Sequence, residues 1–227
     1  MNNNTKPRLE DLNVIVAGQG GDGSLTVVNI LADVLRTSGL RVYTERDVLS
    51  RIKGGITAAT LRAYNGERLC ISSHIDLMVA FDQAAIPKYA FRLNAKSIVI
   101  YDSSNGELTA ESKLPEGVRL IGVPLSRYAV KNFRRDIYKN SISFAVIGRL
   151  IGLDDGQMKI AFDKRFGRRG AQALKYNLDA LNVGCTLADD AGLTIGEGLF
   201  EIVATDSKAH MLITGNEAVA FGFAVAG

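Results

Sequence analysis

A glycine-rich turn after the first apolar run is the strongest candidate for chemistry in this sequence. The run Asn13-Val-Ile-Val-Ala17 leads into Gly18-Gln-Gly-Gly-Asp-Gly23, which has the GxGxxG spacing, and Glu45 follows about where a ribose-binding acid would lie. Glycines allow positive φ and close approach to another surface, and the N-terminus of a following helix offers free N–H groups to an anion. The pattern is therefore compatible with a dinucleotide site, a tight structural turn, or a surface for another anion or subunit.

One residue of this turn argues against a dinucleotide. Asp22 would place a carboxylate in the turn that should receive a pyrophosphate. Like charges about 4 Å apart repel by about 1 kcal/mol even in water.

A second loop combines glycines with cations. Arg46, Arg51 and Lys53 precede Gly54-Gly55 and Thr57. Backbone amides flanked by cations can hold a phosphate or a carboxylate. A solvated surface loop has the same composition, so both interpretations remain open.

Other catalytic and metal-binding patterns are missing from the sequence. Cys70 and Cys185 form neither a CxxC motif nor a disulfide framework, and two cysteines cannot hold an iron–sulfur cluster. His74 and His210 have no histidine or cysteine at ligand spacing, and we interpret both as ordinary loop residues. There is no Ser-His-Asp order and no pair of carboxylates suited to hydrolysis. We therefore expect no catalytic residue and no metal ligand.

The elements around these loops predict an α/β fold. Apolar runs predict strands at 13–17, 40–44, 56–64, 77–81, 97–101 and 118–123, the third ending in a hairpin turn at Asn65-Gly66. Helical spacing predicts helices from Ser24, as its cap, to about residue 38, and over 83–93, 126–151 with a break near Asn140, 154–166 and 170–181. The first helix and its flanking strands predict a βαβ unit. The expected architecture is a three-layer α/β/α Rossmann-like domain with a mostly parallel sheet and C-terminal helices.

Composition limits the class of protein. The 227 residues are 47% hydrophobic and 22% charged, which suits one full α/β domain and a fragment of a second. A net charge of +3 does not indicate nucleic-acid binding. No secretory signal or stretch of about 20 apolar residues is present, so we expect no membrane association and a cytoplasmic location.

The two ends of the chain differ from the middle. Residues 1–12 are expected to be a flexible leader. Weak periodicity predicts a linker over 187–208, with one short strand at 199–203. The apolar helix that follows, within 209–227, is interpreted as the start of an incomplete domain. Packing of this helix on the same core is the alternative.

Six blocks, in order, carry a family resemblance. They are Ile15–Gly23, Arg51–Gly55, Asp76–Gln83, Ile98–Ser104, Gly122–Leu125, and Ile151–Leu153 with Phe166 following. Over about residues 13–183 the chain resembles the gamma subunit or gamma domain of the 2-oxoacid:ferredoxin oxidoreductases. The stretch from Gly215 resembles the start of the alpha domain in members where gamma and alpha are fused. The resemblance thus implies a gamma-type domain over 13–186 and the start of an alpha-type, pyrimidine-binding domain over 209–227.

The resemblance implies a subunit of a thiamine-diphosphate-dependent enzyme that converts a 2-oxoacid and coenzyme A into acyl-CoA, carbon dioxide and two electrons for ferredoxin. Thiamine diphosphate, Mg²⁺ and iron–sulfur clusters would be held by alpha- and beta-type partner chains, so this chain alone would bind no cofactor and would be inactive. Its role would be structural and on the coenzyme A side. By analogy, the residues nearest the substrate channel are Gly18, Gly20, Gly21, Gly23, Lys53, Gly54 and Gly55.

The chain departs from the family pattern at two positions, and it also has a cluster of basic residues. The family usually has Gln or Glu at Asp22 and Arg at Lys53, and Lys lacks the bidentate fork of Arg, so anion affinity could be lower here. Five cations, Arg127, Lys131, Arg134, Arg135 and Lys139, could meet coenzyme A phosphates or acidic ferredoxin, or form a solvated helix face. A free-standing NAD(P)-binding dehydrogenase domain and an assembly scaffold that has lost the active complex are the alternative functions.

Overall fold

A six-stranded sheet forms the centre of the molecule. The computed structural model describes residues 11–48, 55–66, 70–108, 114–193 and 211–227. The strands are β1 (Asp11–Gln19), β2 (Arg41–Asp47), β3 (Ile56–Tyr64), β4 (Leu77–Ala80), β5 (Ile98–Asp102) and β6 (Arg119–Val123). The α-helices are α1 (Ser24–Thr37), α2 (Ala85–Tyr89), α3 (Leu125–Phe133), α4 (Lys139–Leu150), α5 (Asp155–Phe166), α6 (Ala171–Asp190) and α7 (Gly215–Ala226). Short 3₁₀ helices are η1 (Ala90–Arg92), η2 (Ser103–Asn105), η3 (Asp136–Tyr138) and η4 (Gly167–Arg169).

The strand order is β2-β3-β1-β4-β5-β6, and only β3 runs against the others. The expected α/β fold is therefore confirmed. The expected βαβ unit is split, because β3 lies between β1 and β2. The expected hairpin at Asn65-Gly66 is wrong: β3 pairs with β2 and β1, whereas β4 pairs with the other side of β1.

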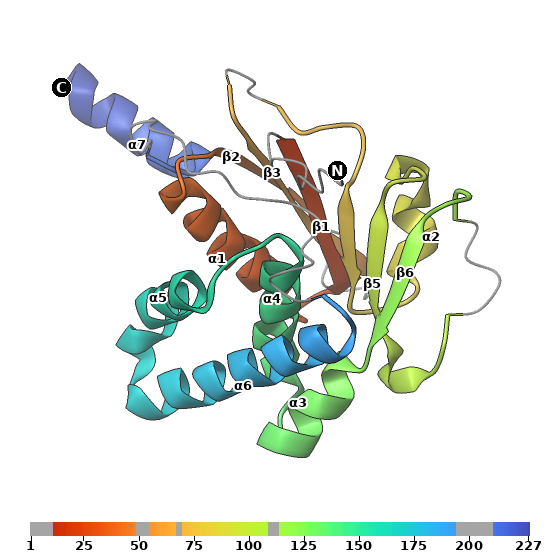
Figure 1. Cartoon of the computed structure of the whole chain (residues 1–227). Helices are drawn as coiled ribbons and strands as arrows, with labels where there is room; N and C mark the ends of the chain where they lie inside the picture. Colours follow the sequence, from red (N-terminus) through yellow and green to blue (C-terminus); the bar gives the residue numbers. More distant parts are fainter. Residues whose placement is uncertain (1–10, 49–54, 67–69, 109–113, 194–210) are drawn as a thin grey trace, which may run out of the picture.

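Alternating side chains of the strands build one core on each face of the sheet. Val14 and Val16 of β1 join the larger cluster, which contains residues of α1 and α3 to α6. Ile15 and Ala17 join the smaller cluster, which contains residues of α2. In Figure 1, α1, α4 and α6 lie to one side of the strands and α2 lies to the other. This alternation produces the three layers predicted from the apolar runs.

Several helix boundaries differ from the expectation. Gly23, not Ser24, is the N-cap of α1, with φ 94°, and Ser24 is the first helical residue. The break expected near Asn140 occurs earlier, where Arg134 adopts φ 59° after α3. The helix expected over 170–181 continues to Asp190, because its further turns bury Cys185, Leu187 and Ala188. Residues 187–190 of the expected linker are thus helical, and the short strand expected at 199–203 lies outside the described residues.

The apolar C-terminal helix is present as α7. Thr214 and Glu217 form a capping box at its start. None of its residues is buried, and Val219, Phe221, Phe223 and Val225 are 51–87% exposed. In this structure α7 therefore buries no residue against the α/β core, and its assignment to a further domain stays a prediction. Within the described ranges, no helix combines the length and apolarity needed to cross a membrane.

Candidate functional site

A polar cavity of about 650 Å³ lies where β1, β4 and β5 end. The carboxyl ends of parallel strands meet at one edge of a sheet, where loops converge to form ligand sites. The cavity is lined by Gln19, Gly20, Asp22, Phe81, Asp82, Gln83, Asp102, Asn105, Ser126, Asp136 and Lys139. We refer to it as the strand-end cavity.

Carboxylates dominate the strand-end cavity. Four of its lining residues are aspartates and one, Lys139, is a cation. Lys139 is 8% exposed and pairs with Asp136 at 2.7 Å, so its charge is largely compensated. A diphosphate placed here would meet an excess of negative charge. The cavity therefore disfavours a diphosphate without a metal ion, such as the pyrophosphate of a dinucleotide.

Two of these carboxylates hold neighbouring backbone groups. Asp102 accepts hydrogen bonds from the backbone N–H of Ser104 at 3.0 Å and of Ser126 at 3.1 Å, and the latter lies in the first turn of α3. Asp82 accepts from Gln19 Nε2 at 2.8 Å and from the Ala84 N–H at 2.9 Å. These contacts fix the rim of the cavity and stabilise the start of a helix.

Asp22 makes two hydrogen bonds within the glycine turn. Its backbone N–H donates to the Gln19 carbonyl at 3.1 Å, and its Oδ1 accepts from the Ser24 N–H at 3.1 Å. Its Oδ2 is buried and has no hydrogen-bond partner among the described residues. Burial raises the pKa of Asp22 above its ordinary value of 3.8, against the opposing effects of the Ser24 N–H and of Lys139.

The four glycines of the first turn fall into two pairs. A Cβ on Gly18 would lie 1.8 Å from Asp22 Oδ2, and one on Gly23 would lie 1.9 Å from Asn140 Nδ2. These two positions are therefore filled by the protein's own side chains. By contrast, Gly20 and Gly21 are exposed and leave open space beside the backbone. Only this second pair presents backbone that a ligand or partner could approach.

The start of β3, which follows the second glycine loop, lies beside the first glycine turn. The register of β1 and β3 places Thr57 opposite Gly18, and Thr57 Oγ1 lies 3.5 Å from the Gly18 carbonyl oxygen. Gly55 is described and partly exposed. Lys53 and Gly54 lie outside the described residues, so their places at the site stay a prediction.

Sequence reasoning did not single out Asp82 and Asp102 as site residues. Both directly follow apolar runs that were predicted as strands, and that position was the available signal. Lys139 was grouped with a basic helix face, but it lies in the strand-end cavity, with Nζ 5.4 Å from the centre of the Phe81 ring. The other members of that cluster, Arg127, Lys131, Arg134 and Arg135, are exposed.

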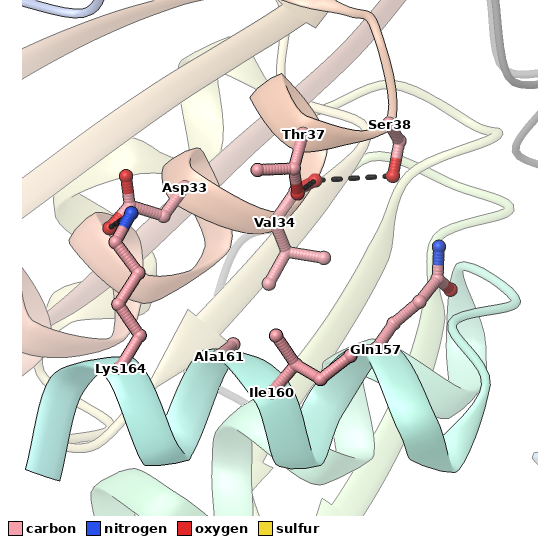
Figure 2. A pocket seen from close by; sticks show the side chains of 8 residues that line it. All are labelled: Asp33, Val34, Thr37, Ser38, Gln157, Ile160, Ala161 and Lys164. Atoms are coloured by element: carbon pink, nitrogen blue, oxygen red, sulfur yellow. Dashed lines mark hydrogen bonds and ion pairs between the residues drawn. The ribbon is translucent and has the colours of Figure 1, made fainter. Parts of the chain in front are cut away.

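A second hollow lies between α1 and α5 and has a volume of about 380 Å³ (Figure 2). Its wall is formed by Val34, Ile160 and Ala161, and an ion pair of 3.5 Å between Lys164 and Asp33 lies beside them. Its lining contains no cysteine or histidine. The hollow thus offers contact surface and no evident chemistry.

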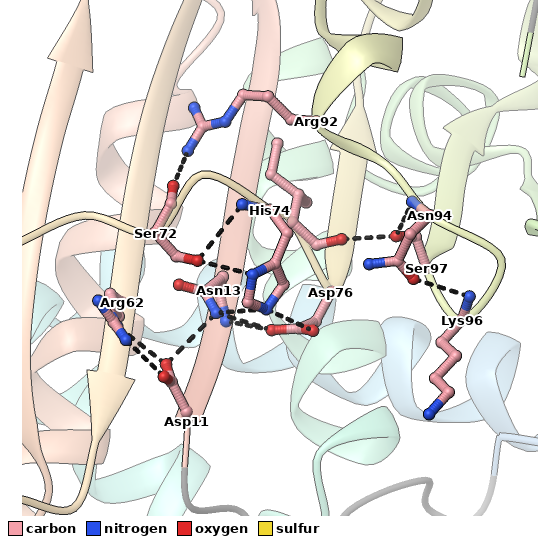
Figure 3. Close-up of polar contacts among 11 residues, drawn as sticks. Asp11, Asn13, Arg62, Ser72, His74, Asp76, Arg92, Asn94, Lys96 and Ser97 are labelled. Atoms are coloured by element: carbon pink, nitrogen blue, oxygen red, sulfur yellow. Dashed lines mark hydrogen bonds and ion pairs between the residues drawn. The ribbon is translucent and has the colours of Figure 1, made fainter. Parts of the chain in front are cut away.

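A polar network occupies the opposite end of β1 (Figure 3). The guanidinium of the buried Arg62 donates hydrogen bonds to the Asp11 carboxylate from Nε, at 2.9 Å, and from Nη2. His74 is half exposed and contacts Ser72 Oγ at 2.8 Å, which agrees with its interpretation as a loop residue. In the parts of the chain that the structure describes, no cluster of three or more His, Cys, Asp or Glu residues could hold a metal ion. The network supports strand ends and does not form a metal centre.

Comparisons with known proteins agree on one family. The family model for pyruvate ferredoxin/flavodoxin oxidoreductase matches residues 13–187. The 2-oxoglutarate synthase subunit KorC of Archaeoglobus fulgidus is 22% identical over 175 residues, which cover 77% of this chain and 86% of that protein. The ketoisovalerate oxidoreductase subunit VorA of Methanothermobacter marburgensis is 26% identical over 186 residues, which cover 80% of this chain and 37% of that protein.

Solved structures give the same result. A chain of the 2-oxoglutarate:ferredoxin oxidoreductase from Magnetococcus marinus, determined with 2-oxoglutarate, coenzyme A and succinyl-CoA bound, matches 96% of this chain with a TM-score of 0.84 and 26% identity. The present chain spans 37% of that chain's length. The keto/oxoacid ferredoxin oxidoreductase gamma subunit from Geobacter sulfurreducens, at 20% identity and a TM-score of 0.66, shows the same fold over 80% of this chain and 98% of its own. Because the family model covers the whole α/β body from β1 into α6, the chain belongs to the pyruvate ferredoxin/flavodoxin oxidoreductase family.

Proposed function

We propose that this chain is the gamma-type component of a 2-oxoacid:ferredoxin oxidoreductase. The complex would convert a 2-oxoacid and coenzyme A into acyl-CoA and carbon dioxide and pass two electrons to ferredoxin. The observation that carries the proposal is the family match over residues 13–187, which is uninterrupted across the sheet and its covering helices. The comparisons support this function and not the alternative of an NAD(P)-binding dehydrogenase domain.

The chain's own part in the complex is structural and lies on the coenzyme A side. The aspartates of the strand-end cavity disfavour a diphosphate without a metal ion there, and two cysteines are fewer than a cluster requires. Alpha- and beta-type partner chains would therefore hold thiamine diphosphate, Mg²⁺ and the iron–sulfur clusters. The exposed backbone at Gly20 and Gly21, and the partly exposed Gly55, would face coenzyme A and those partners, because Gly20 lines the strand-end cavity and Gly21 follows it in the same turn.

The domain organisation follows the same proposal. Residues 13–186 would be the gamma-type domain, 187–208 a connection that begins within α6, and 209–227 the first segment of an alpha-type domain. The support is that α7 is apolar and buries none of its residues against the α/β body. The similar chain of Magnetococcus marinus is much longer than this one, and VorA is longer as well. A cytoplasmic location would suit the two free cysteines, Cys70 and Cys185.

Two measurements test the proposal, one on co-expressed chains and one on the isolated chain. Co-expression with a beta-type chain of the same family should yield a complex that co-purifies, whereas co-expression with an unrelated thiamine enzyme should not. Titration of the isolated chain with NADH to about 1 mM should give no saturable enhancement of NADH fluorescence, because the carboxylates of the strand-end cavity oppose a pyrophosphate. Micromolar NADH binding without association to the beta-type chain would contradict the proposal and favour a dehydrogenase domain.

A further inference from the structure

Strand β2 forms one edge of the sheet. It pairs with β3 along its whole length, from Arg41 opposite Tyr64 to Asp47 opposite Ala58. Among the described residues, no strand pairs with its outer side. Five of its residues, from Tyr43 to Asp47, are exposed. An edge of this kind presents a row of backbone N–H and C=O groups to which another strand can bind.

Charge is what protects this edge against unrelated strands. Edge strands are blocked by charged side chains, proline, bulges or short length, and four of the seven residues of β2 are charged. β2 has seven residues, contains no proline, glycine or lysine, and continues without a bulge along β3. Val42, Tyr43 and Thr44 at its centre are residue types that favour strands. The opposite edge, β6, is shorter, with five residues, and contains Gly122.

The charges of β2 are complementary to those of a second, antiparallel copy. When two copies are aligned about Thr44, Arg41 of each lies opposite Asp47 of the other. Tyr43 then lies opposite Glu45, and Thr44 lies opposite itself. Cross-strand pairs of opposite charge stabilise a sheet, and like charges directly opposite destabilise it. A parallel alignment in the same register would instead oppose Arg41 to Arg41 and Asp47 to Asp47.

Asp47, the acidic residue of this pairing, is oriented by an ion pair and a hydrogen bond within its own chain. Asp47 accepts hydrogen bonds from Lys88 Nζ at 2.8 Å and from the Tyr89 hydroxyl at 2.7 Å. These hydrogen bonds lower the pKa of Asp47, while its side chain remains 47% exposed. Asp47 is thus an oriented carboxylate at one end of the strand, with Arg41 at the other end.

We propose that β2 is a self-association edge, at which two copies of this chain join antiparallel about a twofold axis through Thr44. The two sheets would then form one continuous sheet across the dimer, with the same surface used by both copies. This inference does not depend on the proposed function. If both hold, the edge would join two oxidoreductase assemblies through their gamma-type components.

Substitutions at the exposed Thr44 test both the pairing and its register. Sedimentation velocity of the full chain between about 1 and about 100 µM should show a concentration-dependent dimer for the unmodified protein. Thr44→Lys and Thr44→Glu should each be monomeric, because each places two like charges opposite one another at the axis. An equimolar mixture of the two variants should recover the dimer, because opposite charges then meet only in this register. Recovery also shows that both variants are folded.

Thr186→Lys is the matched control. Thr186 is exposed on α6, away from the β2 edge, and carries the same change in charge. It should dimerise as the unmodified chain does. A chain that stays monomeric throughout the concentration range, a Thr44→Lys variant that still dimerises, or a mixture that remains monomeric would each overturn the proposal.

Discussion

At the scale of single residues, the glycine turn shows that one spacing can serve different physical needs. Gly18 makes room for the Asp22 carboxylate, and Gly23 makes room for the Asn140 amide while adopting a positive φ. Gly20 is required neither for packing nor for a positive φ. A Cβ added at Gly20 would lie 3.7 Å from Thr57 Cγ2, which is an ordinary van der Waals contact. Packing within this chain therefore explains two of the three glycines of the GxGxxG pattern, Gly18 and Gly23.

Alanine substitutions should separate these roles. Gly18→Ala places a methyl group onto Asp22 and the Phe81 Cβ, and overpacking of this kind costs about 1–3 kcal/mol. Gly20→Ala should change the free energy of unfolding by less than about 0.5 kcal/mol. Urea unfolding followed by circular dichroism measures both. Equal stability of the two variants would contradict the packing role of Gly18.

Asp22 should make stability depend on pH. Burial raises its pKa in the folded state, so the folded chain binds the proton more tightly than the unfolded chain. Its contribution is therefore most favourable below the ordinary value of 3.8 and is lost as pH rises through the higher pKa of the folded state. Asp22→Asn removes this titration, so its stability relative to the unmodified chain should increase between about pH 3 and about pH 7. Urea midpoints across that range test this, and a constant difference would contradict it.

At the scale of elements, close contact of helix backbones determines how α6 packs. A Cβ on Gly184 would lie 2.4 Å from the Ile142 carbonyl oxygen of α4, and backbone cannot move aside cheaply. A Cβ on Gly148 would also clash, at 2.5 Å from Met158 Sδ, but a flexible thioether can rotate away. Gly184 thus faces a rigid neighbour on α4, whereas Gly148, which lies on α4, faces a flexible neighbour on α5.

This contrast predicts unequal costs for the same substitution. Gly184→Ala should lower the free energy of unfolding by about 2–3 kcal/mol, because α4 and α6 must separate. Gly148→Ala should cost less than about 1 kcal/mol, since the gain in helix propensity offsets part of the repacking. Denaturant unfolding of both variants provides the comparison. If Gly148→Ala were the more damaging change, the packing of α6 on α4 would be wrong.

The local pattern of the sequence predicts most elements, and the exceptions have physical causes. Buried apolar runs such as Leu77–Ala80 are visible in the sequence because both faces of these strands are covered. The position of β3 between β1 and β2 is not visible, because strand order depends on contacts between distant segments. The end of α6 was missed because Leu187 and Ala188 are buried by packing across elements.

At the scale of the whole molecule, the candidate site could be predicted only in part. The glycine turn singled out in the sequence lies at the edge of the sheet where the strand-end cavity forms. The charge of the strand-end cavity arises from Asp22, Asp82, Asp102 and Asp136, which are far apart in the sequence and meet only after folding. Spacing within one loop therefore left an anion site open, whereas the assembled cavity is acidic.

The exposed helix α7 should contribute little to the stability of the α/β body. Phe223 is 74% exposed, and Phe223→Glu should leave the free energy of unfolding within about 0.5 kcal/mol while reducing binding of a hydrophobic dye. Phe162 is fully buried, and Phe162→Ala should cost about 3–5 kcal/mol. Thermal unfolding and dye fluorescence measure the two effects. A large loss of stability in Phe223→Glu would show that α7 packs against the body.

The most direct test of the proposed function is ferredoxin reduction by a complex assembled from purified chains. Alpha- and beta-type partners would be supplied with thiamine diphosphate, Mg²⁺, a 2-oxoacid and coenzyme A, with and without this chain. We expect coenzyme-A-dependent reduction of ferredoxin only when this chain is present. Equal rates in its absence would contradict its assignment as the gamma-type component.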